Sequence, residues 1–164
     1  TVSPSAKTAA IMKFSVPVTV TISVVMRTPL RRVRPAGRRA SKCPTLQRMT
    51  EFFALEPVKA KLHIQFTGEV LNMHIDKLYD LDADPNNVVR IMIMLQDWEP
   101  GQFIMYGNEQ FDRWRTGDIH KFDWRNIPHA TANASNKPRP MLVVTGVMTD
   151  RTREILGKPI KKRI

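Results

Sequence analysis

The sequence predicts a mainly β domain, a sandwich or barrel of short strands, preceded by a basic N-terminal extension. After about Met49 the chain consists of short apolar segments separated by turn residues, a pattern typical of sandwiches and barrels rather than helical bundles. The length of 164 residues falls within the roughly 100–200 residues of one domain. We therefore expect an extension at residues 1–50, partly disordered, and a β domain at residues 51–164.

The positive charge is concentrated at the N-terminal end. Ten of the 26 Lys and Arg side chains lie in residues 1–50, with none of the 15 acidic ones, so the body is almost electrically balanced. The net charge of +11 therefore belongs to the extension, and it does not indicate nucleic-acid binding by the body.

Two kinds of sequence make up the extension. Phe14–Val25 alternates apolar with small or polar residues, which predicts a strand, and Pro17 favours a place at a sheet edge. Arg27–Lys42 is rich in Arg and interrupted by Pro and Gly, which is typical of a solvated linker. A weakly ordered arm, a nucleic-acid or anionic-surface arm, an organelle-targeting presequence and residues outside the native coding sequence all remain open.

The body has candidate strands divided by Pro, Gly, Asn and Asp turns. Arg151–Leu156 is expected to form a short closing helix, followed by a basic tail at Lys158–Ile164. The expected strands are Leu62–Phe66, Val70–His74, Val88–Leu95, Gln102–Tyr106, Gln110–Trp114, Ile119–Trp124, His129–Ala134 and Pro140–Val147.

The single cysteine, Cys43, excludes an internal disulfide and any site that needs several thiolates, such as a zinc finger or an iron–sulfur cluster. One free cysteine fits a reducing compartment, so we expect a cytoplasmic protein, with organelle targeting by the N-terminus left open. No run of about 18 apolar residues is present to span a membrane, so we expect no membrane partner.

A metal site is indicated where the strand at Val70–His74 ends. His74 and Asp76 are two residues apart, and side chains at such positions on a strand face the same way. With a second imidazole, this pair forms the 2-His-1-carboxylate set that suits non-heme iron(II) and leaves coordination positions open. His129 is the candidate second imidazole.

Arg139 follows ten residues after His129, at the start of the last apolar strand. Its guanidinium can pair with a carboxylate in bidentate fashion, which a lysine would do only as a point charge.

These residues together resemble the iron(II)- and 2-oxoglutarate-dependent oxygenases, whose signature is His-x-Asp, a distal His and an Arg about ten residues beyond it. The resemblance covers roughly residues 62–147. Arg90–Trp98 is similar to a strand and loop of prolyl-hydroxylase-like members, and the stretch from Gly117-Asp118 to Phe122-Asp123-Trp124 resembles the approach to their distal His.

The resemblance implies a double-stranded β-helix, a jelly-roll or cupin-like barrel. It implies that His74, Asp76 and His129 bind Fe(II), that Arg139 binds 2-oxoglutarate, and that the cosubstrate is decarboxylated to succinate while a bound substrate is hydroxylated. Ascorbate is a possible further cofactor. Members of this group usually carry a Tyr where this chain has Met94, so Tyr106 and Thr145 are the candidates to assist Arg139.

The expected substrate is a protein side chain or a small molecule, and Arg90–Trp98 slightly favours a peptide. The alternative is a non-catalytic metal- or ligand-binding β-barrel whose residues 1–50 bind nucleic acid. His63 and His120 are expected to be structural, and the three tryptophans to lie in the core or at a pocket rim. Gln102 and Asn133 are candidate polar contacts in the pocket.

Overall fold

The computed structural model describes residues 19–24, 43–78 and 80–157. Its elements in chain order are β1 (Thr19–Val24), α1 (Pro44–Phe52), β2 (Leu55–Gln65), β3 (Val70–His74), the 3-10 turn η2 (Pro85–Asn87), β4 (Val88–Met94), β5 (Gln102–Tyr106), β6 (Glu109–Phe111), β7 (Ile119–Lys121), β8 (His129–Asn133), β9 (Arg139–Met148) and α2 (Asp150–Gly157).

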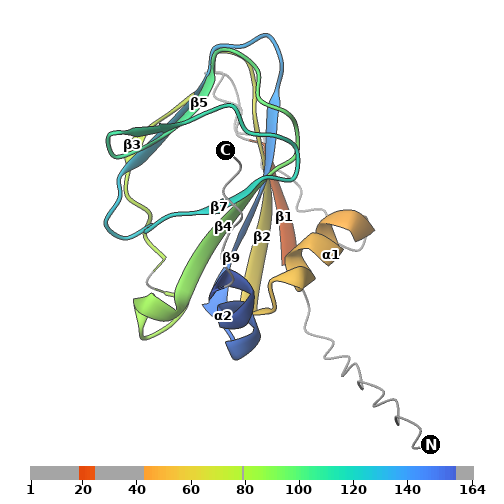
Figure 1. Cartoon of the computed structure of the whole chain (residues 1–164), viewed down its shortest axis with the longest axis vertical. Helices are drawn as coiled ribbons and strands as arrows, with labels where there is room; N and C mark the ends of the chain where they lie inside the picture. The colour runs from red at the N-terminus through yellow and green to blue at the C-terminus, as the bar shows by residue number, and fades with distance from the viewer. Residues whose placement is uncertain (1–18, 25–42, 79, 158–164) are drawn as a thin grey trace, which may run out of the picture.

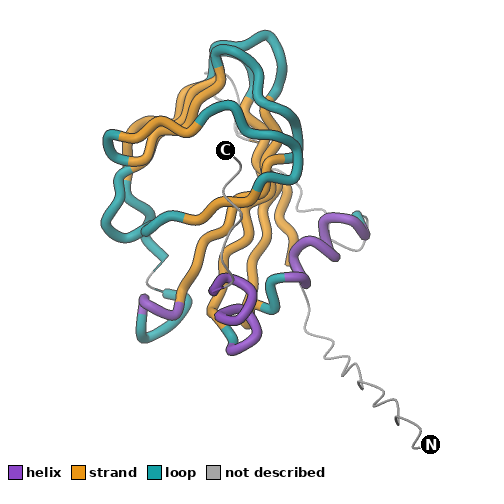
Figure 2. Tube along the Cα trace, in the orientation of Figure 1, coloured by secondary structure: helices purple, strands orange, loops and turns teal. Residues whose placement is uncertain are grey.

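The strands form two sheets that face each other (Figures 1 and 2). The five-stranded sheet has the order β1-β2-β9-β4-β7, and the four-stranded sheet has the order β3-β8-β5-β6. The antiparallel pairs are nested, with β2 on β9, β3 on β8, β4 on β7 and β5 on β6. This nesting makes the chain cross between the sheets at nearly every connection, and it confirms the expected double-stranded β-helix.

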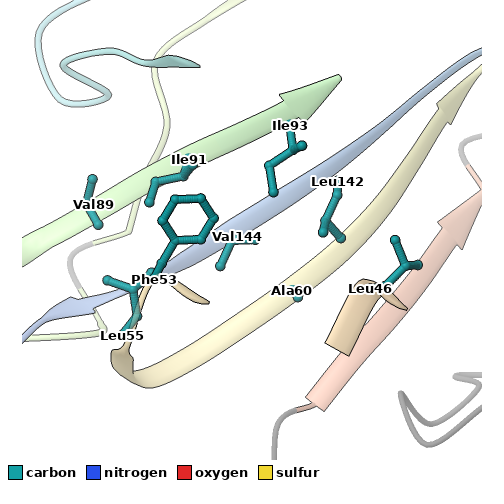
Figure 3. Packing of buried hydrophobic residues seen from close by; sticks show 9 residues of the cluster. All are labelled: Leu46, Phe53, Leu55, Ala60, Val89, Ile91, Ile93, Leu142 and Val144. Atoms are coloured by element: carbon teal, nitrogen blue, oxygen red, sulfur yellow. The ribbon is translucent and has the colours of Figure 1, made fainter. Parts of the chain in front are cut away.

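The five-stranded sheet has an apolar core on each face, because its strands alternate. On β4, Ile91 and Ile93 face the outer core with Leu142 and Val144 of β9, where Phe53 and Leu46 also pack (Figure 3). Full burial of such side chains stabilises the fold by about 1.5–3 kcal/mol each. The inner core lies between the sheets and holds Met92, Met94, Ile104, Trp114, Met141 and Val143.

Helix α1 was not expected from the sequence, since its nine residues directly follow the Arg-rich stretch. Pro44 lies in its first turn, where the missing N–H is tolerated, and Leu46 and Thr50 are buried. The helix spans the expected division at residue 50, so packed structure in the described chain begins before residue 51. The division itself stays a prediction.

Most expected strands are confirmed, with changes at their ends. β3 and β5 have the expected bounds, but β2 begins at Leu55 rather than Leu62, because Lys59 and Lys61 alternate with buried or half-buried apolar residues. β6 and β7 end earlier than expected. α2 confirms the closing helix. β1 lies at the expected edge, parallel to β2. The rest of Phe14–Val25, the Arg-rich stretch to Lys42 and the tail from Lys158 lie outside the described residues.

Gly101 fixes the turn before β5. Its φ of +92° is in the region that favours glycine, and an added Cβ would lie 2.9 Å from the backbone of Ala134 and Ser135. The Ala134 N–H donates to the Gly101 carbonyl over 2.8 Å. This close approach joins the start of β5 to the end of β8, the two strands that carry Tyr106 and His129.

Candidate metal centre and cavity

The two candidate histidine ligands face each other across a strand pair. His74 is the last residue of β3, His129 is the first residue of β8, and the register places them opposite one another. Their ring centroids lie 4.2 Å apart. Asp76 follows two residues after β3 ends, and its side chain is buried beside both rings. The fold therefore brings together three residues that the sequence singled out.

The distances between the candidate ligand atoms fit a metal site whose side chains would move slightly inwards when an ion binds. The Nε2 atom of His74 lies 3.8 Å from Oδ1 of Asp76, and Nε2 of His129 lies 3.8 Å from Oδ2. One candidate ligand atom from each residue lies within 4.8 Å of the others. Neighbouring ligands on one ion, with bonds of about 2.1 Å, are roughly 3 Å apart, so side-chain shifts below about 1 Å would complete the set.

Local contacts prepare the imidazoles as ligands. Nδ1 of His74 donates to the backbone carbonyl of Asn72 over 2.8 Å, which leaves Nε2 with a free lone pair towards Asp76. Burial lowers the pKa of His129, and the negative charge of Asp76 opposes this shift. A neutral imidazole is the form that binds metal. The buried Oδ2 of Asp76 has no hydrogen-bond partner in the described chain, and a contact with the backbone of Ile127 acts to raise the pKa of His129.

Asp76 also touches a cation. Nη1 of Arg90 lies 2.6 Å from Oδ2 of Asp76, although the contact is not aligned along an N–H bond and so is an ion pair rather than a hydrogen bond. Arg90 belongs to β4, on the other sheet, so this pair connects the two sheets at the site.

A cavity of about 220 Å³ opens beside the histidines. This is below the roughly 300–1,000 Å³ of sites for drug-sized ligands, so it suits a small molecule. The cavity is lined by residues of both sheets, namely Lys61, His63, Leu71, His74, Arg90, Met92, Ile104, Tyr106, His129, Thr131, Met141 and Val143.

The wall supplied by the five-stranded sheet is basic. Burial, and then the charge of Arg90, lowers the pKa of Lys61 from its ordinary value. Burial lowers the pKa of His63 to about 4, so this imidazole is neutral near pH 7. Lys61 and Arg90 are thus the cations of the lining, and the neighbouring Asp76 already pairs with Arg90. The electrostatics favour an anionic ligand.

Tyr106, a candidate from the sequence, lines the cavity. Its hydroxyl lies 2.6 Å from Nε2 of His120. Burial raises the pKa of Tyr106 above its usual value and lowers the pKa of His120 to about 4, so the phenol keeps its proton and the imidazole is neutral. His120 therefore has the packing role expected of it and also orients Tyr106.

Arg139 is buried below the cavity and is not part of its lining. Its Nη2 donates to Oε1 of Gln65 over 2.6 Å, its Nη1 donates to the Phe103 carbonyl over 3.4 Å, and its guanidinium lies 5.8 Å above the Trp114 ring. Burial lowers the pKa of Arg139 to about 10, and the electrostatic influence of Tyr106 opposes this shift. Arg139 is thus hydrogen-bonded to a buried amide and within electrostatic reach of the cavity residue Tyr106.

Thr145 is not placed to assist Arg139. It lies six positions further along β9, about 20 Å away at roughly 3.3 Å per residue, and it pairs with Arg90 on β4. The expectation failed because both residues are on one long strand that crosses the whole sheet. Gln102 and Asn133, the other expected polar contacts, lie outside the cavity lining and hydrogen-bond to the Ser135–Lys137 turn.

Sequence reasoning missed three residues of the cavity wall, namely the cations Lys61 and Arg90 and the neutral His63. Lys61 and His63 were inconspicuous because alternate polar residues are normal on a strand. Arg90 carried a stronger signal, because it is the single charged residue within the apolar run Val88–Met94. Trp114 and Trp124 are buried as expected, and the indole of Trp124 donates to the Val88 carbonyl.

None of the helices in the described ranges is both long and apolar enough to cross a membrane. No protein-family model matches the sequence, and no curated protein is similar to it.

Several solved structures of low sequence identity resemble the chain. A cupin protein from Bacteroides fragilis is 16% identical with a TM-score of 0.43, over 59% of this chain and 71% of that one. The Cnp3 cupin domain of Schizosaccharomyces pombe is 11% identical with a TM-score of 0.42, over 66% and 69%. A cupin 2 conserved barrel domain protein from Salinispora arenicola is 11% identical with a TM-score of 0.40, over 63% and 73%.

Proposed function

We propose that this protein is an iron(II)- and 2-oxoglutarate-dependent oxygenase that hydroxylates a protein side chain or a small molecule and converts 2-oxoglutarate to succinate and carbon dioxide. The observation that supports it most is the cluster of His74, Asp76 and His129 beside a small basic cavity. The cluster offers ligands for a metal ion, and the adjacent basic cavity would attract a small dianion.

His74, Asp76 and His129 would hold the iron, and bound iron(II) would supply oxygen activation at the positions that three protein ligands leave open. The chain's own part is to position these groups and to exclude water. His74 is oriented by its bond to the Asn72 carbonyl, and His129 is fixed by the pairing of β8 with β3 and β5. Met92, Met141 and Val143 give the cavity an apolar wall.

The two carboxylates of 2-oxoglutarate would bind at two different places in the barrel. The keto-acid end belongs at the metal, and the distal carboxylate would meet Arg139 next to the Tyr106 hydroxyl. Arg139 would exchange its bond with Gln65 for a bidentate, charge-assisted one. Lys61 is the competing anchor, because it already lines the cavity.

The primary substrate is proposed to be a protein side chain or a small molecule. A peptide substrate is slightly favoured because Arg90–Trp98 resembles prolyl-hydroxylase-like sequences. A set of peptides compared with free amino acids as substrates decides between the two classes.

The experiment is to measure succinate formed from 2-oxoglutarate with iron(II) and ascorbate, in the intact protein and in His129→Ala. We expect turnover in the intact protein and none in the variant. Lys121→Ala is the control, because Lys121 is exposed on β7 and lies outside both the cavity lining and the three-residue cluster. An intact protein without turnover, or a His129→Ala variant with full turnover, would contradict the proposal.

The concentration of charge in residues 1–50 supports a second proposal, in which the barrel binds metal or ligand without catalysis and the extension binds nucleic acid. Binding that neutralises several phosphates weakens steeply with salt. Replacing Arg31, Arg32, Arg34, Arg38 and Arg39 with Ser should then abolish nucleic-acid binding measured at low salt. Unchanged binding would reject this second function.

A further inference from the structure

Arg90 is an unusual residue for its position. It interrupts the apolar run of β4, it faces the barrel interior, and its side chain is only 22% exposed. An Arg on a buried strand face needs a partner, because an unpaired buried charge is strongly destabilising. Its ion-pair partner is Asp76, with Nη1 at 2.6 Å from Oδ2.

The position of the Asp76 side chain depends on its contact with Arg90, whereas other contacts fix the positions of the two histidines. Both histidines belong to strands, and His74 has a further bond to a backbone carbonyl. Asp76 lies beyond the end of β3, and no donor in the described residues forms an aligned hydrogen bond with its carboxylate. The Arg90 ion pair is therefore the interaction that fixes where the carboxylate points.

The two carboxylate oxygens are in different surroundings. Each oxygen lies 3.8 Å from one imidazole, Oδ1 from Nε2 of His74 and Oδ2 from Nε2 of His129, but only the fully buried Oδ2 also lies against Arg90. Because Oδ2 already carries a cation contact and Oδ1 forms no ion pair with Arg90, Oδ1 is the oxygen left for a metal. A carboxylate held in this way enters the site through one oxygen and leaves the remaining coordination positions open.

We propose that Arg90 is a positioning residue of the metal centre, which holds the Asp76 carboxylate through Oδ2 so that Oδ1 is presented to a divalent ion. The inference rests on the metal-binding part of the proposed function and does not depend on 2-oxoglutarate. Residues in such outer positions typically contribute 10–100-fold to metal affinity.

The charge of Arg90 and its role in positioning Asp76 predict opposite effects on metal affinity when the side chain is removed. A cation near a divalent ion repels it, so loss of charge alone would tighten metal binding. Loss of positioning would weaken it. Lys61 separates the two effects, because it is another cation of the same cavity wall and has no ion pair with Asp76 in the described chain.

The test is the dissociation constant of Mn(II), measured by calorimetry on the metal-free intact protein and on Arg90→Met, Arg90→Lys and Lys61→Met. We expect Arg90→Met to bind about 10–100-fold more weakly, Arg90→Lys to recover most of the affinity, and Lys61→Met to bind at least as tightly as the intact protein. Thermal unfolding without metal shows whether each variant is folded at the temperature of the titration.

Equal or tighter binding by folded Arg90→Met would overturn the positioning role while leaving the metal site in place. Weaker binding that Arg90→Lys does not rescue would also overturn it, since a general disturbance of the wall would then explain the loss. If the intact protein binds no Mn(II), both the inference and the proposed function fail.

Discussion

Two polar regions inside the barrel, an amide network and the candidate metal site, differ in how many hydrogen bonds hold their side chains. The amide network, which consists of Gln65, Gln102, Asn133, Ser135 and Arg139, has many hydrogen bonds, and Asn133 alone donates to the Gln65 and Lys137 carbonyls and accepts from Ser135, although Gln102 Oε1 and Arg139 Nε have no partner among the described residues. The metal end, which consists of His74, Asp76 and His129, is held by fewer side-chain contacts, chiefly the hydrogen bond from His74 Nδ1 to the Asn72 carbonyl and the ion pair of Asp76 with Arg90.

Strand β8 connects the two regions, with His129 as its first residue and Asn133 as its last, about 13 Å apart at roughly 3.3 Å per residue. We infer that the amide side chains of Gln65, Gln102 and Asn133 stabilise the barrel, whereas the metal end, which has fewer internal hydrogen bonds, is the part that receives a ligand.

The largest expected effect is on metal binding by the metal end. His74→Ala should weaken Mn(II) or Co(II) binding by more than the 10–100-fold typical of outer residues, because it removes a ligand. His63→Ala is the matched control, since His63 lines the same cavity outside the three-residue cluster. Equal losses in the two variants, measured by calorimetry, would contradict the assignment of ligands.

Next in size is the effect of Arg139 on the cosubstrate. Arg139→Met should raise the KM for 2-oxoglutarate about 10–100-fold, the equivalent of losing a charge-assisted hydrogen-bond pair of about 1.5–3 kcal/mol. Lys61→Met should change this KM less. The reverse order, with Lys61→Met the more damaging substitution, would show that the cavity wall and not the buried guanidinium anchors the carboxylate.

A smaller and purely structural effect distinguishes two residues of β8 that face the interior. Asn133→Leu should lower the free energy of unfolding by about 2–3 kcal/mol, because it leaves the Gln65 and Lys137 carbonyls without this donor. Thr131→Val should change it by less than about 0.5 kcal/mol, since its hydroxyl has no partner to lose. Denaturant titration of both variants measures the difference, and equal losses would remove the contrast between the regions.

The last effect is on the pH dependence of stability, which appears as a slope over a range of pH rather than as a loss at one pH. Burial lowers the pKa of His63 and of His120 from 6.5 to about 4, so the unfolded chain binds more protons than the folded one between these values. Stability should therefore fall as the pH drops from 6.5 towards 4, by up to about 1.4 kcal/mol per pH unit for each histidine. His63→Leu should flatten this slope in denaturant titrations at several pH values, and an unchanged slope would argue against a buried neutral His63.

The sequence predicted the metal end better than the rest of the site. His74 and Asp76 could be found because a His-x-Asp pair is a short-range pattern with ligand chemistry, and His129 because its spacing to Arg139 resembles a known family signature. Lys61 and Arg90 could not, because their place in the cavity depends on the long-range pairing of β2 and β4 with β9. The Thr145 expectation failed for a different reason, because Arg139 and Thr145 lie six positions apart on the single long strand β9.

Much of the fold also followed from alternation and turn residues, whereas α1 did not. Its helical state depends on burying Leu46 and Thr50 against the sheet, and tertiary contacts of this kind leave little trace in nine residues.

The most direct test of the proposed function is an anaerobic calorimetric titration of 2-oxoglutarate into the iron(II)-loaded protein and into the metal-free protein. We expect one molecule of 2-oxoglutarate to bind per iron-loaded chain and much weaker binding without iron, because the metal and Arg139 would each hold one end of the dianion. Equal binding with and without iron, or no binding to a chain that has bound iron, would contradict an oxygenase that uses this cosubstrate.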